Sequence, residues 1–554
     1  MRIIRICNET LVMRVLLTLI CLLLALPVLG VLGAWLAFDA AAGAILLHQA
    51  QTVLAGYALQ SLLLAAFVAV GVALLGGGAA AAVALFEFPG RRVFEWALLL
   101  PMAMPAYVLA YVYTDFLQFS GPLQTALRSA TGREGALWPD VRSLPGAVVL
   151  FVLCLYPYVY LLVRTALAER GIQMMEAARL LGAGLWRRIG AVALPLSRPA
   201  LVAGVALALM ETLADYGVGA YFGLTTFSTG IYKAWLVMND RIAAAQLASL
   251  LLLGVALLLW AERHARKHLR FAASRGSQQA SSNEGRAVAL RGRLALLAWS
   301  LCALPVAFGF LLPLALLVRL VWQEARLGDF GLPWARFAQW CLTSFQLAAT
   351  AALLAATLAL GLAFALRVAA ARADHRWPAR VLGVAARTVS LGYAVPGAVI
   401  AVGILLPVGA VQALWPAAPL AGIVTGSVAG LLYAYLVRFS AVALQSLEAG
   451  YARLPASLDD SARMLGASRG RLLAEVHLPL LRRSVLAAVL LVFVDVMKEL
   501  PATLVLRPFN SDTLAVVAYN LARDERLAEA ALPSLAIVAV GLLPVLWLSR
   551  AMRR

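Results

Sequence analysis

Long apolar stretches recur along the whole chain, and they limit its possible folds more than any other feature. Each stretch is long enough, at about 20 residues, to cross the hydrocarbon core of a bilayer as a helix. Hydrophobic residues make up 63% of the 554 residues and charged residues only 13%, which excludes a water-soluble surface. We therefore predict an all-α, polytopic membrane protein embedded in the lipid bilayer.

About twelve spans are predicted, six in each half of the chain. In the first half they lie at about 15–38, 61–86, 93–119, 145–168, 198–220 and 243–261. In the second half they lie at about 294–320, 344–370, 382–407, 420–447, 484–506 and 531–549. A polar stretch around 277–283 predicts an exposed linker at 263–293. The expected transmembrane domains are therefore 1–262 and 294–554, each with six helices.

Arginines gather in alternate loops and at both ends of the chain, which predicts the orientation in the membrane. With an even number of spans, both termini and the linker lie on one side. The arginines on that side include Arg2, Arg5, Arg91, Arg92, Arg164, Arg187, Arg188, Arg372, Arg376, Arg380, Arg469, Arg471, Arg482, Arg483, Arg553 and Arg554. The opposite loops 39–60 and 408–420 contain no Lys or Arg. Positive loops stay inside, so both termini are predicted to be cytoplasmic, and the net charge of +19 needs no nucleic-acid partner.

One polar segment occurs twice, after the fourth predicted span of each half. Residues 176–183 (EAARLLGA) recur as residues 460–467 (DSARMLGA), and the register continues without a gap to two Leu-Pro-Leu motifs, at 194–196 and 478–480. Because six spans is an even number, the two halves insert with the same orientation. The predicted architecture is a parallel repeat with a pseudo-twofold axis along the membrane normal.

Each copy of the repeated segment predicts a short helix, a glycine turn and a second short helix that ends near a proline. Glu176 and Asp460 are expected near the start of the first helix, where the helix dipole favours negative charge. Small residues then allow a partner surface to approach closely. The turn is assigned to Gly182 and Gly466, since a larger side chain would strain it. The return into the membrane is assigned to Pro195 and Pro479.

The doubled motif resembles the EAA loop of binding-protein-dependent ABC importer permeases, and the resemblance covers essentially the whole chain. It implies the type I, MetI-like fold, with coupling loops at about 170–197 and 448–483 that dock with ATPase subunits. The second copy has Asp460 and Ser461 where Glu and Ala are usual, a difference that allows asymmetric docking. The resemblance assigns the docking role to Glu176, Ala177, Ala178, Gly182, Asp460, Ser461, Ala462 and Gly466.

The resemblance also implies the partners and the location of the chain. None of its three lysines follows a glycine, so it has no phosphate-binding loop of the Gly-Lys-Ser/Thr type. We therefore expect a transport subunit rather than an enzyme, with no cofactor of its own. ATP and Mg belong to two copies of a separate ATPase subunit, and cargo arrives on a periplasmic binding protein. The expected location is the bacterial inner membrane.

Four carboxylates lie within the predicted spans. Glu211 and Asp215 are four residues apart, on one helical face, and the repeat register pairs them with Asp495 and Glu499. Lys498 is placed to neutralise one member of the second pair. Ionisable groups inside a span are costly and usually face a pathway or a partner. They either line the translocation path or tie helices together and cap a span.

Segments 210–235 and 498–509 resemble ferric-iron ABC permeases. Hard cations prefer oxygen ligands, so we predict ferric iron as cargo, with Glu211, Asp215, Asp495 and Glu499 as transient metal ligands. The same architecture also fits an importer of thiamine, a polyamine or an aminophosphonate. A secondary transporter with parallel halves is the remaining alternative, but it would not explain the doubled motif.

Overall fold

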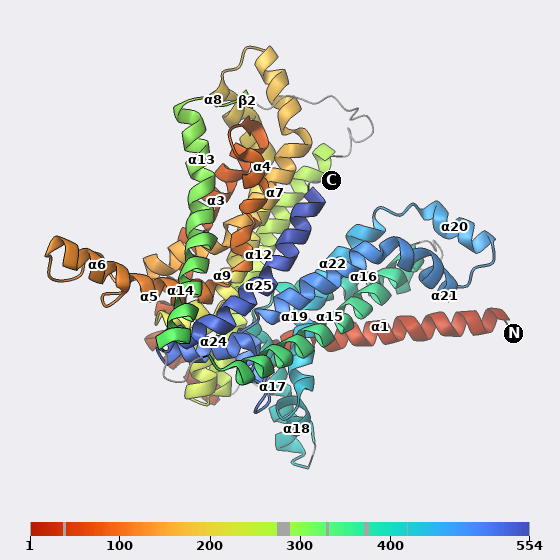
Figure 1. Ribbon diagram of the computed structural model, residues 1–554. Coiled ribbons are helices and arrows are strands. Elements are labelled where there is room, and N and C mark those ends of the chain that lie inside the picture. The colour runs from red at the N-terminus through yellow and green to blue at the C-terminus, as the bar shows by residue number, and fades with distance from the viewer. Residues whose placement is uncertain are drawn as a thin grey trace. The chain divides into compact units, whose positions relative to one another are not determined.

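The computed structural model describes residues 2–36, 40–273, 288–327, 332–370, 376–417 and 419–552 (Figure 1). The described chain is helical almost throughout, so the all-α prediction is confirmed. Its strands, β1 (Phe86–Glu87) and β2 (Val288–Ala289), pair in parallel. The polar stretch 277–283 of the predicted linker lies outside the described residues.

The chain divides into two compact units that do not follow the sequence halves. Unit 1 comprises residues 1–46, 231–249 and 334–516. Its helices are α1 (Arg2–Gly33), α15 (Trp334–Ala370), α16 (Arg376–Leu391), α17 (Gly397–Leu414), α18 (Leu420–Thr425), α19 (Val428–Tyr451), α20 (Ala456–Met464), α21 (Arg469–Arg471), α22 (Leu478–Met497) and α23 (Pro501–Leu506). The N-terminal helix α1 packs on α16 and α17, which come from the other half of the sequence.

Unit 2 comprises residues 47–230, 250–333 and 517–554. Its helices are α3 (Leu54–Leu85), α4 (Arg91–Ala97), α5 (Ala106–Leu117), α6 (Pro122–Thr131), α7 (Leu144–Leu180), α8 (Leu185–Arg188), α9 (Leu194–Ala214), α10 (Gly217–Tyr221), α13 (Arg293–Val306), α14 (Leu312–Leu327) and α25 (Leu527–Met552). Here α14 packs on α5 and α25. The first helices of the two halves are thus exchanged. The helices that pass from one unit into the other are α2 (Ala40–Thr52), α11 (Phe227–Tyr232), α12 (Arg241–Ala273) and α24 (Leu514–Arg523).

Among the described residues, nine helices are long and apolar enough to cross a membrane. A tenth span forms if Arg91–Ala103 and Ala106–Thr131, which meet at an 88° bend, count as one. The count of about twelve also included the apolar part of α1, Leu17–Gly33, which is shorter, and α22, which carries Arg482, Arg483 and Asp495. The polytopic membrane fold is confirmed, with nine or ten spans meeting the length and composition of a full span.

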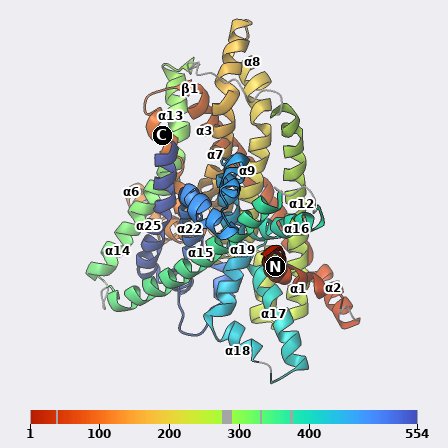
Figure 2. The same cartoon turned by 90° about the vertical axis from the view of Figure 1, so that its right-hand side faces the viewer.

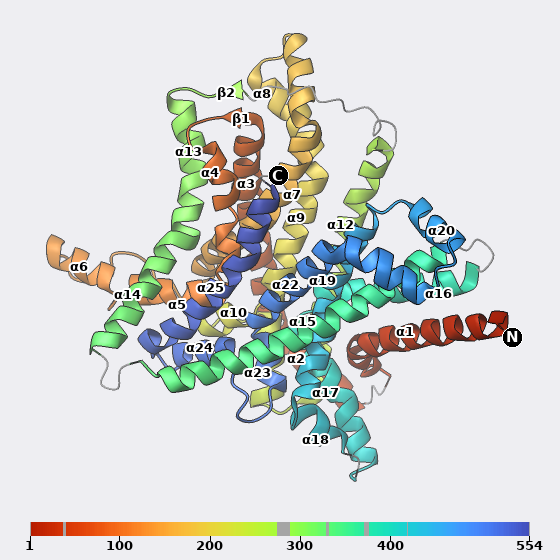
Figure 3. The same cartoon turned by 45° about the vertical axis from the view of Figure 1, so that its right-hand side comes forward.

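Each unit contains a matching group of three packed helices. In unit 1, α15, α19 and α22 contact one another, as Figures 1 and 3 show, and in unit 2 α3, α7 and α9 do the same. The starts of α7 and α19, and those of α9 and α22, are separated by the same number of residues as Glu176 and Asp460. Gly76 allows α3 to approach α7, because a Cβ there would lie 2.6 Å from the Tyr156 carbonyl oxygen.

Three helices begin with a Leu-Pro pair that directly follows a π-helical turn. The π turns are Ile189–Ala193 before α9, Ala307–Leu311 before α14, and Leu472–His477 before α22. Proline lacks an N–H, and its ring crowds the carbonyl four residues earlier. The wider π turn relieves that crowding without ending the helix. Pro195 and Pro479, predicted at the return into the membrane, accordingly lie in the first turn of α9 and α22.

Candidate functional site

The two copies of the repeated motif form the same turn. Gly182 has φ of +79° and Gly466 has φ of +80°, the left-handed region that glycine adopts without strain. Ala183 N–H donates to the Ala178 carbonyl and Gly182 N–H to that of Arg179, which is the Schellman pattern. Ala467 and Gly466 make the equivalent bonds in the second copy. The predicted glycine turns are therefore confirmed in both halves.

Each turn presents two large apolar side chains to solvent. Leu180 and Leu181 are 89% and 88% exposed, and their counterparts Met464 and Leu465 are 89% and 88% exposed. Apolar residues in such positions have nothing to pack against within their own unit. Their recurrence in both copies is the feature expected of a surface that another protein covers. Figure 2 shows α8, which follows the first of these turns, at the tip of unit 2.

The helices that lead into the two turns differ. Glu176, Ala177 and Ala178 lie near the C-terminal end of α7, a single helix of 37 residues that continues from the span. The prediction that Glu176 lies near a helix start is wrong, so the dipole does not favour its charge there. In the second copy α19 ends at Tyr451, and a separate helix, α20, begins after Pro455.

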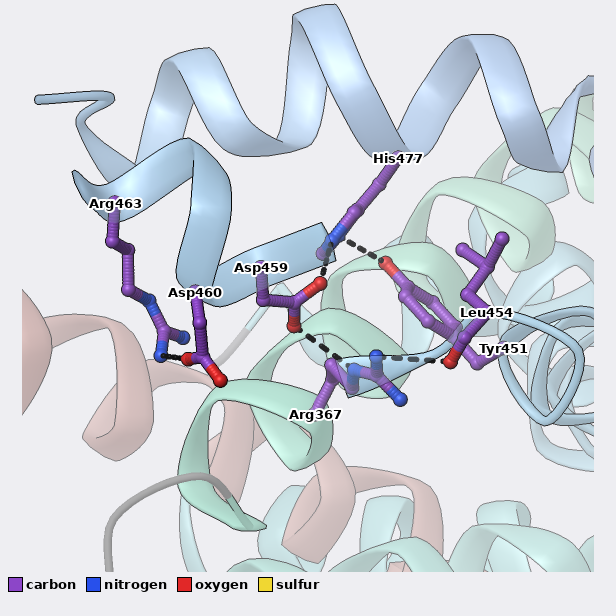
Figure 4. Close-up of polar contacts among 7 residues, drawn as sticks. All are labelled: Arg367, Tyr451, Leu454, Asp459, Asp460, Arg463 and His477. Atoms are coloured by element: carbon purple, nitrogen blue, oxygen red, sulfur yellow. Dashed lines mark hydrogen bonds and ion pairs between the residues drawn. The ribbon is translucent and has the colours of Figure 1, made fainter. Parts of the chain in front are cut away.

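A buried polar network holds α20 against its unit (Figure 4). Asp459 lies in the first turn of α20 and is only 3% exposed. Its Oδ2 accepts a hydrogen bond of 2.9 Å from Arg367 Nε of α15, and its Oδ1 lies 3.0 Å from His477 Nε2. His477 Nδ1 lies 3.2 Å from the Tyr451 hydroxyl, at the end of α19. Arg367 also donates to the carbonyl of Leu454, in the turn between α19 and α20.

Asp459 is held as a carboxylate. Burial opposes its ionisation, but hydrogen bonds and positive charge from Arg367 and His477 outweigh that effect and lower the pKa of the carboxyl. A lowered pKa stabilises the fold fully above the unfolded-state value of about 3.9 and loses that effect only as the pH falls through the folded value. The two ring nitrogens of His477 lie within hydrogen-bond distance of Asp459 and of the Tyr451 hydroxyl, so each group in the network has a partner.

The neighbouring acid, Asp460, points away from this network. Its side chain is 70% exposed and pairs at 3.4 Å with Arg463, three residues along α20 (Figure 4). Ser461 is exposed as well, and Ala462 is half-buried. The predicted docking residues of the second copy thus face outward, while the residue before them anchors the helix.

The predicted pathway carboxylates lie where two helices break. α9 ends at Ala214 and α22 at Met497, so Asp215 and Glu499 lie beyond the helix ends. The prediction that Glu211 and Asp215 share one continuous helical face is therefore wrong. Asp215 Oδ1 accepts from the Val218 N–H at the start of α10. Glu499 Oε1 accepts from the Ala502 N–H at the start of α23. The two carboxylates cap equivalent short helices.

Basic side chains balance both carboxylates of the second pair. Lys498 Nζ lies 2.9 Å from Asp495, the neutralisation that the sequence allowed. Arg438 Nη1 lies 3.4 Å from Glu499, whose side chain is 2% exposed. The capping and pairing of Glu499 fit the alternative that these residues tie helices together. Among the described residues, no group of three or more His, Cys, Asp or Glu side chains is placed to hold a metal ion.

Residues 73–271 match the family described as binding-protein-dependent transport system inner membrane component. The chain contains a domain of this family and resembles its permeases. The permease is 24% identical over 506 residues to the Fe(3+)-transport system permease protein FbpB 2 of Haemophilus influenzae, and the alignment covers 88% of each chain. The resemblance to ABC importer permeases is confirmed.

Other relatives match the permease over shorter segments. PhnU of Salmonella paratyphi A, named for 2-aminoethylphosphonate transport, is 28% identical over 196 residues, which are 35% of the permease and 68% of PhnU. The molybdenum transport system permease protein ModB of Escherichia coli is 30% identical over 135 residues, 24% of the permease and 57% of ModB. The permease is thus an inner-membrane ABC transporter subunit that works with a binding protein and an ATPase.

Sequence reasoning missed the buried network. It singled out Asp460 and not Asp459, and it did not remark on Arg367, His477 or Tyr451. One signal was available: Arg367 lies inside the predicted span 344–370, and a charged residue there needs a partner. An acidic residue one position before the repeated motif was the natural candidate.

Replacing Gly466 with valine should strain the second turn by about 1–2 kcal/mol, because a residue with a Cβ is disfavoured at positive φ. Space around the Cβ is open, so backbone conformation alone sets the cost. Amide hydrogen exchange of residues 465–467 measures the change in local opening free energy. Gly470→Val is the matched control, since Gly470 also has open space but lies in α21 without a positive φ. Equal exchange in the two variants would contradict this reading of the turn.

Proposed function

We propose that the permease imports ferric iron from the periplasm, driven by ATP hydrolysis on separate ATPase subunits. The observation that carries this proposal is the alignment with FbpB 2, a Fe(3+)-transport permease, over 88% of both chains. The relatives named for other cargo match much shorter segments. The likeness of segments 210–235 and 498–509 to ferric-iron permeases supports the same cargo.

Two ATPase copies are proposed, one under each coupling loop. The support is the duplicated turn, with Leu180 and Leu181 exposed in one copy and Met464 and Leu465 in the other. ATP and Mg are bound by those partners, and this chain holds no cofactor. The loops therefore lie in the cytoplasm, as do both termini, in agreement with the distribution of arginine.

Glu211 and Asp215 are the proposed cation-contacting groups in unit 2, and Asp495 is the one proposed in unit 1. Glu499 contributes less in this proposal, because Arg438 balances its charge and α23 uses both of its oxygens. A hard trivalent ion would bind such carboxylates only transiently, since a translocation path must also release its ion.

The double variant Glu211→Ala with Asp495→Ala should lower uptake of radioactive iron about tenfold, equivalent to about 1.4 kcal/mol of lost ion stabilisation. Cells expressing the permease with its ATPase and binding protein are assayed at matched protein levels. The control is Glu134→Ala with Asp524→Ala, which removes two exposed carboxylates. Uptake at the control rate would remove Glu211 and Asp495 from the path.

An aminophosphonate is the second candidate cargo. Lys498 and Arg438 balance Asp495 and Glu499, so this part of unit 1 carries no net negative charge to select a cation. The same cells are therefore given labelled 2-aminoethylphosphonate, thiamine, a polyamine and molybdate beside iron. Uptake of one of these, with none of iron, would replace the ferric proposal while leaving the importer role intact.

A further inference from the structure

The buried network around α20 has no polar equivalent in the first half. The repeat register pairs Tyr451, Asp459 and His477 with Leu167, Met175 and Ala193, and the buried serines Ser61 of α3 and Ser344 of α15 align Arg367 with Ala84. All four first-half residues are apolar, and none is more than 4% exposed. The same position in the fold is therefore filled by an apolar cluster in one half and by a charged, hydrogen-bonded cluster in the other.

The connection between span and docking turn differs in the same way. In the first half the continuous helix α7 links the span directly to Gly182, so any displacement of the turn moves the span. In the second half the helix is interrupted, with a turn between Tyr451 and Ala456 that contains Pro455. Without another connection, α20 would be free to pivot about this interruption.

The network bridges that interruption. It joins α20 through Asp459 to α15 through Arg367, and to the π turn before α22 through His477. Tyr451 brings in the end of α19, and the Leu454 carbonyl fixes the connecting turn. The three helices of the unit 1 bundle are thus all tied to α20. Hydrogen bonds to a fixed fork of donors also specify orientation, which apolar packing does less strictly.

We propose that Arg367, Asp459, His477 and Tyr451 are positioning residues that make the separate docking helix α20 move as one body with α15, α19 and α22. The inference rests on the proposed docking of α20 with an ATPase subunit. It assigns the two coupling loops different mechanical connections, a continuous helix in the first half and a polar network in the second.

The decisive variant gives the second half an apolar cluster like that of the first: Arg367→Val, Tyr451→Leu, Asp459→Met and His477→Ala together. Replacing a whole buried ionic cluster with apolar residues is often neutral or stabilising, so the variant should unfold at no lower temperature than the wild type. The full transporter, with its ATPase and binding protein, is reconstituted in liposomes. The cargo supplied is the one that the cellular uptake experiments identify. Cargo transported per ATP hydrolysed should fall about fivefold or more, the usual range of coupling between sites.

Leu167→Met with Met175→Leu is the matched control, because it exchanges apolar residues of the first-half cluster and should leave the ratio unchanged. A wild-type ratio in the fourfold variant, with the ATPase still bound, would overturn the positioning role. Failure of wild-type permease to retain the ATPase would instead overturn the proposed docking. If the fourfold variant does not accumulate, Tyr451→Leu with His477→Ala keeps the Arg367–Asp459 pair. An intermediate ratio would then support the proposal and a wild-type ratio would refute it.

Discussion

Arg438→Met should lower the free energy of unfolding of the permease by about 3–5 kcal/mol. Arg438, in the middle of α19, and Glu499 are both buried, and each is the charge partner of the other at 3.4 Å. Methionine fills similar space but leaves the carboxylate of Glu499 buried without its counter-charge. The backbone N–H groups of Ala502 and Thr503 still bind that carboxylate, but they carry no net charge. Thermal or denaturant unfolding in detergent measures the loss.

Arg463→Met is the matched control for this prediction. It removes the same side chain from an arginine–aspartate pair, but Arg463 and Asp460 are 38% and 70% exposed. An exposed pair of this kind is worth about 0–1 kcal/mol. Adding Glu499→Gln to Arg438→Met should recover part of the stability, because no buried charge then remains. Equal losses of stability for Arg438→Met and Arg463→Met would mean that burial does not determine how much an ion pair contributes to the free energy of unfolding.

The turns at Gly182 and Gly466 were predictable because their conformation depends only on residues close in the sequence. A Schellman turn needs only a glycine and a few neighbours, and the repeated glycine marked both turns in the sequence. Long apolar stretches likewise identified the helices. The positions at which the helices are interrupted were harder to predict, because carboxylates that follow α9 and α22 cap the next helix. From the sequence alone, both segments are predicted to be continuous spans, without the breaks that the capping contacts show.

Contacts between distant segments were not predictable from one sequence. Arg367 and Asp459 are 92 residues apart, and nothing local indicates that they meet. The exchange of first helices is of the same kind, since α1 is equally apolar whichever half it packs against. The repeat register nevertheless indicated where the two halves differ. A charged residue in one half that aligns with an apolar residue in the other marks a position where the two halves are packed differently.

The two halves expose similar turns but connect them to the membrane helices in different ways. Both glycine turns expose the same kind of apolar pair, so in the proposed docking each half offers a comparable contact to an ATPase subunit. The connections behind the pairs differ, through α7 in one half and through the Asp459 network in the other. Loss of a docking contact should therefore weaken assembly similarly in the two halves, whereas loss of the network should affect coupling in the second half alone.

Leu180→Asp with Leu181→Asp, or Met464→Asp with Leu465→Asp, should reduce affinity for the ATPase subunit about 30-fold or more, the effect of losing about 2 kcal/mol at an interface hot spot. Each pair is almost fully exposed at the tip of its turn, so aspartate there leaves the folded permease unchanged. In a docked complex the same aspartates would be desolvated against a partner surface. Binding of purified ATPase to permease in nanodiscs measures the effect.

Phe509→Asp is the control, because Phe509 is 94% exposed but lies in a loop predicted on the opposite side of the membrane. It should leave ATPase binding unchanged, which separates docking from a general effect of removing exposed apolar surface. The variant with all four aspartates should bind no ATPase while keeping the thermal stability of the wild type. ATPase binding at wild-type affinity in that variant would show that the partner contacts another surface. The coupling role would then have to be sought away from Gly182 and Gly466.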